Sequence, residues 1–286
     1  MLCAAARPLS RPALARPGLY PLLIVAFRPF WPRLATFSVR VMATVCEYLR
    51  PVTLAEAIAY LDRPGAVLVG GGTKVNPSPT AEPITVVDLQ ALPFDRIEGA
   101  GPRRVAIGAT VTLQQLVDGA ELPGSVREAA RREQPSTLRS VATVGGCVAA
   151  ADPSSELLAT LLVHDSTVTL VSARATTKVG LDALLGSGVP AGSVITVVML
   201  ETGGVTSTAR TGRTQADRPI VTAVARRAPA GEVRLALAGV ADRPLLVPPV
   251  QELLAELRPP GDFRGSAEYR RALATVLGTR ALEGVG

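Results

Sequence analysis

The sequence predicts an α+β protein with two domains, and three observations support this. Hydrophobic residues make up 48% of the 286 residues and charged residues 19%, which is enough apolar material for a sizeable core. Short apolar runs of strand length alternate with segments whose apolar residues recur at helical spacing. A stretch rich in Gly, Thr and Ser at 202–208 has the composition of a boundary. We therefore expect a leader over 1–44, a larger domain over 45–204 and a smaller α+β domain over 205–286.

The helices are predicted from N-caps and from periodicity. Thr53 precedes a segment whose apolar residues share one helical face, and Glu56 follows three residues later, as in a capping box. Thr112 has the same place before another such segment. The predicted helices of the larger domain cover 54–61, 113–117, 125–134 and 155–163. Two further helices, near 250–257 and 266–277, are expected to close the chain.

Apolar runs of four to eight residues predict the strands. The first two would be parallel strands of a βαβ-like unit. Runs in the second domain are expected to be strands or a strand plus a helix. The predicted strands cover 66–69, 84–89, 105–109, 167–171 and 194–200, followed by 220–225 and 233–240.

The basic charge of the chain belongs to its leader. Before Glu47 the chain carries six arginines and neither lysine nor acid, which accounts for the whole net charge of +6. The body is therefore electrically balanced, and aromatic residues are only 3%, so we expect no nucleic-acid partner. The apolar run at 22–27 is too short to span a bilayer. We favour an over-extended start with Met42 as the first residue; a targeting segment and a disordered tail are the alternatives. We expect a cytoplasmic protein.

Cysteine and histidine usage excludes most metal centres. The three cysteines, Cys3, Cys46 and Cys147, are widely spaced and form no CxxC pair. An iron–sulfur cluster, a structural zinc site and a disulfide framework therefore lack ligands within this chain. The single histidine, His164, is interpreted as a surface or helix-end residue, because a catalytic base would need a nucleophile and an orienting group. We nominate no catalytic residue and no metal ligand.

Two glycine-containing turns are the most informative feature. Gly70-Gly71-Gly72-Thr73-Lys74 follows an apolar strand run, and Thr143-Val144-Gly145-Gly146 forms a second turn. Residues without a Cβ let backbone N–H groups approach an anion closely, and two such cradles suit a diphosphate. Each alone is more often an ordinary tight turn. Neither has P-loop spacing or forms a strand-to-helix GxGxxG element, so ATP hydrolysis and a Rossmann site are poorly supported.

Three other groups have both a structural and a functional interpretation. The run from Asp152 to Glu156 first indicates a helix N-terminus capped by Asp152 or Ser154, although Glu156 would also suit a sugar hydroxyl. Cys147 follows a glycine pair and is interpreted as a small packed residue that could also approach a ligand. The adjacent arginines at 131–132 are interpreted as a solvated helix face.

With these residues in view, the chain resembles the FAD-binding (medium) subunit of the molybdenum hydroxylases, which include xanthine dehydrogenase and aerobic carbon monoxide dehydrogenase. Residues 69–75 are similar to the family's AGG[TH]xL loop, 142–147 to its ATIGGN loop, and 153–157 to its P-x-x-D-L motif. Further similarities lie at 48–57, 107–110, 234–244 and 266–271, so the resemblance runs from about 45 to 282.

This resemblance implies a two-domain FAD-binding fold of the vanillyl-alcohol-oxidase/molybdopterin-dehydrogenase type. FAD would lie between the domains with its diphosphate on the two loops, Glu156 would contact FAD, and Ile195 would lie close to the flavin ring. The implied cofactor-binding residues are Val69, Gly70, Gly71, Gly72, Thr73, Lys74, Val75, Thr143, Val144, Gly145, Gly146, Cys147, Glu156 and Ile195.

The resemblance also implies an electron-transfer oxidoreductase that does not turn over substrate alone. A molybdenum-cofactor large subunit would oxidise the substrate, and a small subunit with two [2Fe–2S] clusters would deliver electrons to FAD, which would reduce NAD or another acceptor. Relatives are typically dimers of heterotrimers. The alternatives are a family member that has lost FAD and acts as a scaffold, and a free-standing flavin oxidase.

The sequence departs from the family pattern at three places. Cys147 stands where the family has Asn, Glu156 where it has Asp, and the proline-rich 76–79 replaces an apolar continuation of the first loop. None of these changes removes a diphosphate site that is built from backbone N–H groups. We expect them to alter FAD affinity and flavin potential instead.

Overall fold

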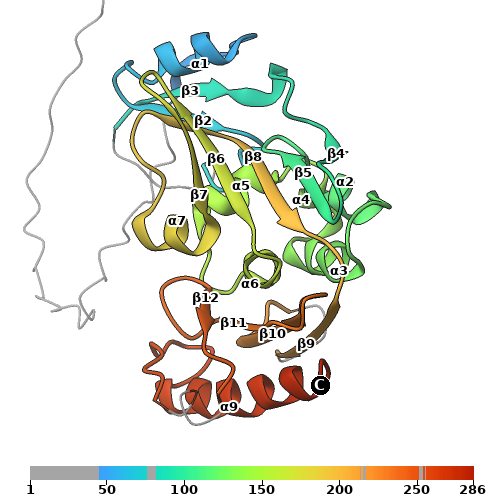
Figure 1. Ribbon diagram of the computed structural model, residues 1–286. Coiled ribbons are helices and arrows are strands. Elements are labelled where there is room, and N and C mark those ends of the chain that lie inside the picture. The colour runs from blue at the N-terminus through green and yellow to red at the C-terminus, as the bar shows by residue number, and fades with distance from the viewer. Residues whose placement is uncertain (1–44, 76–81, 213, 215–216, 251–253, 255) are drawn as a thin grey trace, which may run out of the picture. The chain divides into compact units, whose positions relative to one another are not determined.

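A computed structural model describes residues 45–75, 82–212, 214, 217–250, 254 and 256–286 (Figure 1). The leader over 1–44 and the proline-rich 76–79 lie outside the described residues, as does half of the helix predicted near 250–257. The described residues form three β-sheets with helices packed on them. No helix among them is both long and apolar enough to cross a membrane.

The first sheet is parallel and carries the first glycine segment at its edge. Its strand order is β1-β3-β2, and the pairing of β2 with β3 confirms the parallel arrangement expected for the first two predicted strands. Helix α1 packs on this sheet through Ala57, which is fully buried. Thr53 caps α1, since its Oγ1 accepts from Glu56 N at 3.2 Å. The elements are β1 (Val45–Leu49), α1 (Leu54–Tyr60), β2 (Ala66–Val69) and β3 (Ile84–Asp88).

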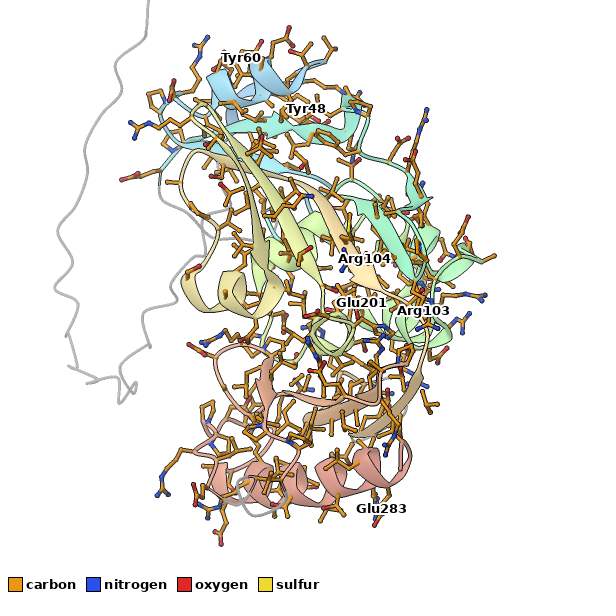
Figure 2. The ribbon with its side chains drawn as sticks, viewed as in Figure 1. Tyr48, Tyr60, Arg103, Arg104, Glu201 and Glu283 are labelled. Carbon is orange, nitrogen blue, oxygen red and sulfur yellow. The ribbon has the colours of Figure 1, made fainter. Side chains whose placement is uncertain are left out.

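The second sheet is antiparallel and has five strands in the order β4-β5-β8-β6-β7. Its central strand, β8, is buried on both faces over 194–196 and then alternates between buried and partly buried residues up to Glu201. At one end of the β5–β8 pair, Arg104 lies opposite Glu201, with Nη2 3.7 Å from Oε1 (Figure 2). The strands are β4 (Ile97–Gly99), β5 (Arg104–Gly108), β6 (Thr167–Ser172), β7 (Thr176–Gly180) and β8 (Ser193–Glu201).

Helices cover the second sheet and supply most of the largest core. Every residue of α6 is buried, which fits its run of leucines, and α6 packs on both α3 and the third sheet. Thr112 caps α2, as predicted, and together with Gln115 it forms a complete capping box at the start of this helix. The helices are α2 (Leu113–Asp118), α3 (Gly124–Glu133), α4 (Ser136–Arg139), α5 (Val144–Ala150), α6 (Glu156–Val163) and α7 (Leu181–Ser187).

The third sheet lies between α6 and the C-terminal helix α9 (Figure 1). Its strand order is β12-β11-β10-β9, and all its pairs are antiparallel. Val224 and Ala236 belong to the core on the α6 side, whereas their neighbours Ala225 and Leu235 belong to the core under α9. The elements are β9 (Val205–Thr211), β10 (Val221–Arg227), β11 (Val233–Ala238), β12 (Leu245–Val247) and α9 (Ala267–Glu283). The division of the chain between 204 and 205 falls in the β8–β9 connection and stays a prediction.

The structure corrects several sequence-based expectations. The second glycine segment is the first turn of helix α5 rather than a turn, because Thr143 caps a helix whose glycines permit close packing. Ser155 caps α6, in place of the Asp152 or Ser154 expected, since its Oγ accepts from Leu158 N at 3.0 Å. The strand β7 and the helix α7 were not anticipated: β7 is polar and lacks an apolar run, and α7 is only seven residues long, although its Leu181, Leu184 and Leu185 are buried.

Candidate cofactor-binding site

The first glycine segment is in direct contact with the residues that precede α5. A Cβ atom built on Gly71 would lie 1.7 Å from the carbonyl oxygen of Val141, and one on Gly70 would lie 2.4 Å from Thr143 Oγ1. Gly72 has a φ of +69°, in the left-handed region that favours glycine. Two segments that are about seventy residues apart in the sequence therefore lie side by side, and only glycine permits this approach.

The backbone N–H groups of the second segment are already engaged within the protein. Val144 N donates to Val111 O at 2.9 Å, Gly145 N to Ala109 O at 2.9 Å and Cys147 N to Thr143 O at 2.9 Å. Gly146 N donates to Thr143 Oγ1 at 3.2 Å. These bonds hold the start of α5 against residues 109–111, which follow β5. The second segment therefore forms a wall of the site, and its N–H groups are not available to a ligand.

In the first segment, in contrast, backbone N–H groups are available to bind a ligand. Among the described residues, no group accepts a hydrogen bond from the backbone N–H of Gly71, Gly72 or Thr73. Partly buried N–H groups in native proteins normally find a partner, which can be water or a ligand. Consecutive N–H groups in a glycine-rich bend form a concave site for an anion.

Both segments line one pocket of about 310 Å³, and a smaller pocket of about 80 Å³ adjoins it. The two pockets share Leu68, Gly70, Thr143, Gly146 and Ala149, so the point where the segments touch lies between them. Of the predicted site residues, the larger pocket is lined by Val69, Gly70, Gly71, Gly72, Thr73, Lys74, Val75, Thr143, Gly146 and Cys147, and the smaller pocket also by Gly145 and Ile195. Val144 and Glu156 line neither pocket.

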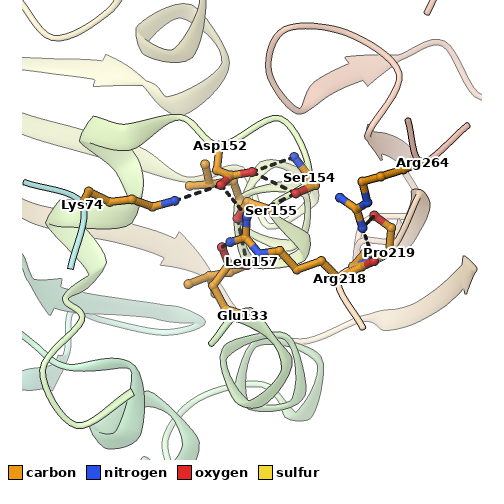
Figure 3. Close-up of polar contacts among 10 residues, drawn as sticks. Lys74, Glu133, Asp152, Ser154, Ser155, Leu157, Arg218, Pro219 and Arg264 are labelled. Carbon is orange, nitrogen blue, oxygen red and sulfur yellow. Dashed lines mark hydrogen bonds and ion pairs between the residues drawn. The ribbon is translucent and has the colours of Figure 1, made fainter. Parts of the chain in front are cut away.

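A carboxylate that the sequence analysis did not nominate lies at the larger pocket (Figure 3). Asp152 Oδ2 is 3.0 Å from Lys74 Nζ and 2.5 Å from Arg218 Nη1. Burial alone would raise the pKa of Asp152, but the hydrogen bonds and charges of Arg218 and Lys74 outweigh it and hold that pKa below its ordinary value. Asp152 is therefore ionised at neutral pH and joins the first glycine segment to the residues before β10.

Arg218 also pairs with a second, buried carboxylate, that of Glu133 (Figure 3). Its Nη2 is 3.5 Å from Glu133 Oε1, and Glu133 Oε2 accepts from Ser155 Oγ at 3.0 Å and from Leu157 N at 3.2 Å. Burial raises the pKa of Glu133 above its ordinary value, and Arg218 opposes that shift. Arg218 therefore links the pocket edge to the N-terminus of α6.

Glu156, the acid that the resemblance places against FAD, is held elsewhere. Its Oε1 is 3.1 Å from Arg132 Nη1, and its Oε2 forms an ion pair with Arg210 Nε at 3.1 Å, without hydrogen-bond geometry. The side chain is buried, and burial raises its pKa while the two arginines oppose the shift. Arg132 is exposed on its helix, as expected, and from this solvated face its guanidinium reaches the buried carboxylate of Glu156.

Comparison with known proteins identifies the class of this site. Residues 34–200 match the family model described as "FAD binding domain in molybdopterin dehydrogenase". The chain belongs to this family. It is 29% identical over 248 residues to the uncharacterized protein YgfM of Escherichia coli K12, covering 81% of this chain and 93% of that protein. It is 24% identical over 278 residues to the glyceraldehyde dehydrogenase medium chain of Sulfolobus acidocaldarius, covering 84% of this chain and 98% of that one.

Solved structures share the fold of this molybdopterin-dehydrogenase FAD domain. Carbon monoxide dehydrogenase from Hydrogenophaga pseudoflava, in a form lacking the Mo-pyranopterin moiety, superposes with a TM-score of 0.77 at 21% identity, covering 86% of this chain and 98% of that one. Quinoline 2-oxidoreductase from Pseudomonas putida 86 gives a TM-score of 0.72 at 21% identity, covering 84% and 96%. The fold predicted from the resemblance is confirmed.

The residues present fit FAD, the cofactor of this family. A dinucleotide needs a diphosphate site with room for a group on each side, and the first glycine segment provides N–H donors at the junction of two pockets. A side chain at Gly71 would overlap the backbone of Val141 and force the two segments apart. Within the described ranges, no three His, Cys, Asp or Glu side chains gather as metal ligands.

Cys147 and His164 have structural environments. Cys147 lines the larger pocket, and burial raises the pKa of its thiol well above the ordinary value, so it presents a neutral thiol. His164 ends α6, as expected, but is buried rather than on the surface. Its Nδ1 donates to Glu201 O at 2.7 Å, so its Nε2 accepts from Ser125 Oγ at 3.0 Å, and burial lowers its pKa to about 4. His164 thus joins α6, β8 and α3 as a neutral residue.

Proposed function

We propose that this chain is the FAD-binding electron-transfer subunit of a molybdenum hydroxylase complex. In this role it receives electrons from [2Fe–2S] clusters of a small partner subunit and passes them through FAD to NAD or another acceptor. The observation that carries the proposal is the convergence of two distant glycine segments on one pocket, in a chain of the molybdopterin-dehydrogenase FAD family. FAD, when bound, supplies the redox chemistry, and the protein binds and orients it.

The first glycine segment would hold the diphosphate. The N–H groups of Gly71, Gly72 and Thr73, which bond to no acceptor among the described residues, supply donors, and Lys74 adds positive charge beside them. The second segment, fixed by its own hydrogen bonds, supplies the opposing wall through Thr143 and Gly146. Together these groups orient the cofactor without any acid–base residue.

The two pockets would take the two halves of FAD. The larger pocket, with Asp152 at its edge, suits the adenosine, because an ionised carboxylate accepts hydrogen bonds from ribose hydroxyls. The smaller pocket has apolar walls, including Leu68, Leu89 and Ile195, and suits part of the flavin ring. This agrees with the place that the resemblance gave to Ile195.

The partners are inferred from the chain's own chemistry and from its relatives. Three cysteines are too few for two [2Fe–2S] clusters, and the Sulfolobus relative is named as the medium chain of a dehydrogenase. These points support a complex with a molybdenum-cofactor large subunit and a [2Fe–2S] small subunit. We propose that this complex is a dimer of heterotrimers in the cytoplasm, as the resemblance implies.

Titration of the purified apoprotein with FAD tests the proposal. We expect one FAD per chain, and FMN, which lacks the adenosine half, should bind at least about tenfold more weakly, since a lost adenosine removes well over 1.4 kcal/mol of contact free energy. The FAD-loaded chain alone should not turn over substrate. A chain that stays colourless after reconstitution would instead be a scaffold, and turnover by the isolated chain would indicate a flavin oxidase.

A further inference from the structure

A buried hydroxyl beside the glycine segments has no partner. Thr110 follows β5 and is 7% exposed, and its Oγ1 forms no hydrogen bond with any described residue. The backbone of the residue is fixed, because Thr110 N donates to Phe94 O at 3.0 Å. Buried side-chain hydroxyls in native proteins nearly always have a partner, so an orphan that also lines a pocket points to a partner from outside the chain.

Thr110 lines the smaller of the two pockets. The other walls of this pocket are largely apolar, and Gly145 and Gly146 of α5 lie among them. Nearby threonines are satisfied: Thr196 Oγ1 donates to Thr169 O at 3.2 Å, and Thr143 Oγ1 accepts from Gly146 N at 3.2 Å. Ser193 also lines the pocket. A largely apolar pocket with a few polar groups is the usual form of a site that binds a flat ring and sets its orientation.

We propose that the Thr110 hydroxyl donates a hydrogen bond to a nitrogen or carbonyl oxygen of the FAD isoalloxazine ring. The inference rests on the proposed function and names a cofactor-contacting residue for it. The apolar walls receive the ring, and Thr110 fixes which edge of the ring enters. In the apoprotein the same hydroxyl is a buried polar group without compensation, so it destabilises the empty chain and favours the loaded one.

The test uses Thr110→Val, which exchanges the hydroxyl for a methyl group of similar size. Without FAD, the variant should melt about 2 °C higher than the wild type, because an unsatisfied hydroxyl has been removed. Its dissociation constant for FAD should rise about tenfold. The visible absorption band of bound FAD should also shift, since only the isoalloxazine half absorbs there. Thr110→Ser should restore both the affinity and the spectrum.

Thr222→Val is the matched control. Thr222 Oγ1 is also buried and has no hydrogen-bond partner in the part of the chain that the structure describes, but Thr222 lies on β10 and lines neither pocket. This variant should raise the melting temperature of the apoprotein and leave FAD affinity and spectrum unchanged. A Thr110→Val protein that binds FAD with the wild-type constant, or more weakly but with the wild-type spectrum, overturns the inference. A wild-type chain that binds no FAD overturns the proposed function as well.

Discussion

Replacing Gly71 by alanine is expected to abolish FAD binding and to lower the free energy of unfolding by about 3 kcal/mol. The new Cβ would lie 1.7 Å from the Val141 carbonyl oxygen and 2.4 Å from its carbon. Both are backbone atoms that no side-chain rotation can move. The first segment must therefore separate from the residues that precede α5, and the junction between the two pockets opens. Urea unfolding and FAD titration of the same preparation measure the two effects.

Gly124→Ala is the control for this substitution. Gly124 begins α3, and a Cβ built on it meets no heavy atom within 4 Å. Alanine is a better helix former than glycine, so this variant should be as stable as the wild type or up to about 1 kcal/mol more stable, with unchanged FAD affinity. If Gly71→Ala bound FAD as tightly as Gly124→Ala does, the contact between the two segments would not form the cofactor site.

The second large effect is expected at Asp152. Asp152→Asn keeps the shape of the side chain but removes the charge that pairs with both Lys74 and Arg218. We expect FAD to bind roughly 10- to 100-fold more weakly, because a hydrogen bond to a charged acceptor contributes about 1.5–3 kcal/mol. The FAD dissociation constants of the two proteins, measured at equal ionic strength, give this ratio.

Glu156→Gln tests whether the carboxylate that contacts FAD is Asp152, as proposed here, or Glu156, as the resemblance implies. Glu156 is buried between Arg132 and Arg210 and lines neither pocket. Breaking a buried ion pair on one side leaves charges uncompensated, so this variant should lose about 3 kcal/mol of stability. The fraction that remains folded should bind FAD normally. Weaker binding in Glu156→Gln, with normal binding in Asp152→Asn, would return the cofactor contact to Glu156.

Local sequence signals were sufficient to predict those features of the structure that depend on residues close together in the chain. The caps at Thr53 and Thr112 were predicted from the residue type before an apolar helical face, and both form as expected. The glycine segments were found because only glycine suits a backbone that must approach another closely, and the positions of Gly70 and Gly71 against the second segment show that approach.

The exact environment of each acid depends on residues far away in the chain. Arg210 of β9 and Arg132 of α3 draw Glu156 into the core, whereas Arg218 and Lys74 hold Asp152 at the pocket. No spacing rule within the Asp-Pro-Ser-Ser-Glu run distinguishes these two outcomes. Likewise, an unpartnered hydroxyl such as that of Thr110 can be recognised only when its surroundings are known.

Amide hydrogen exchange with and without saturating FAD tests most directly whether the first glycine segment holds the diphosphate. The N–H groups of Gly71, Gly72 and Thr73 should exchange rapidly in the apoprotein and become protected when FAD binds. Those of residues 144–147, which already donate to protein groups, should change little and serve as an internal reference. Unchanged rapid exchange at 71–73 in the FAD-loaded chain would contradict this account of how the cofactor is held.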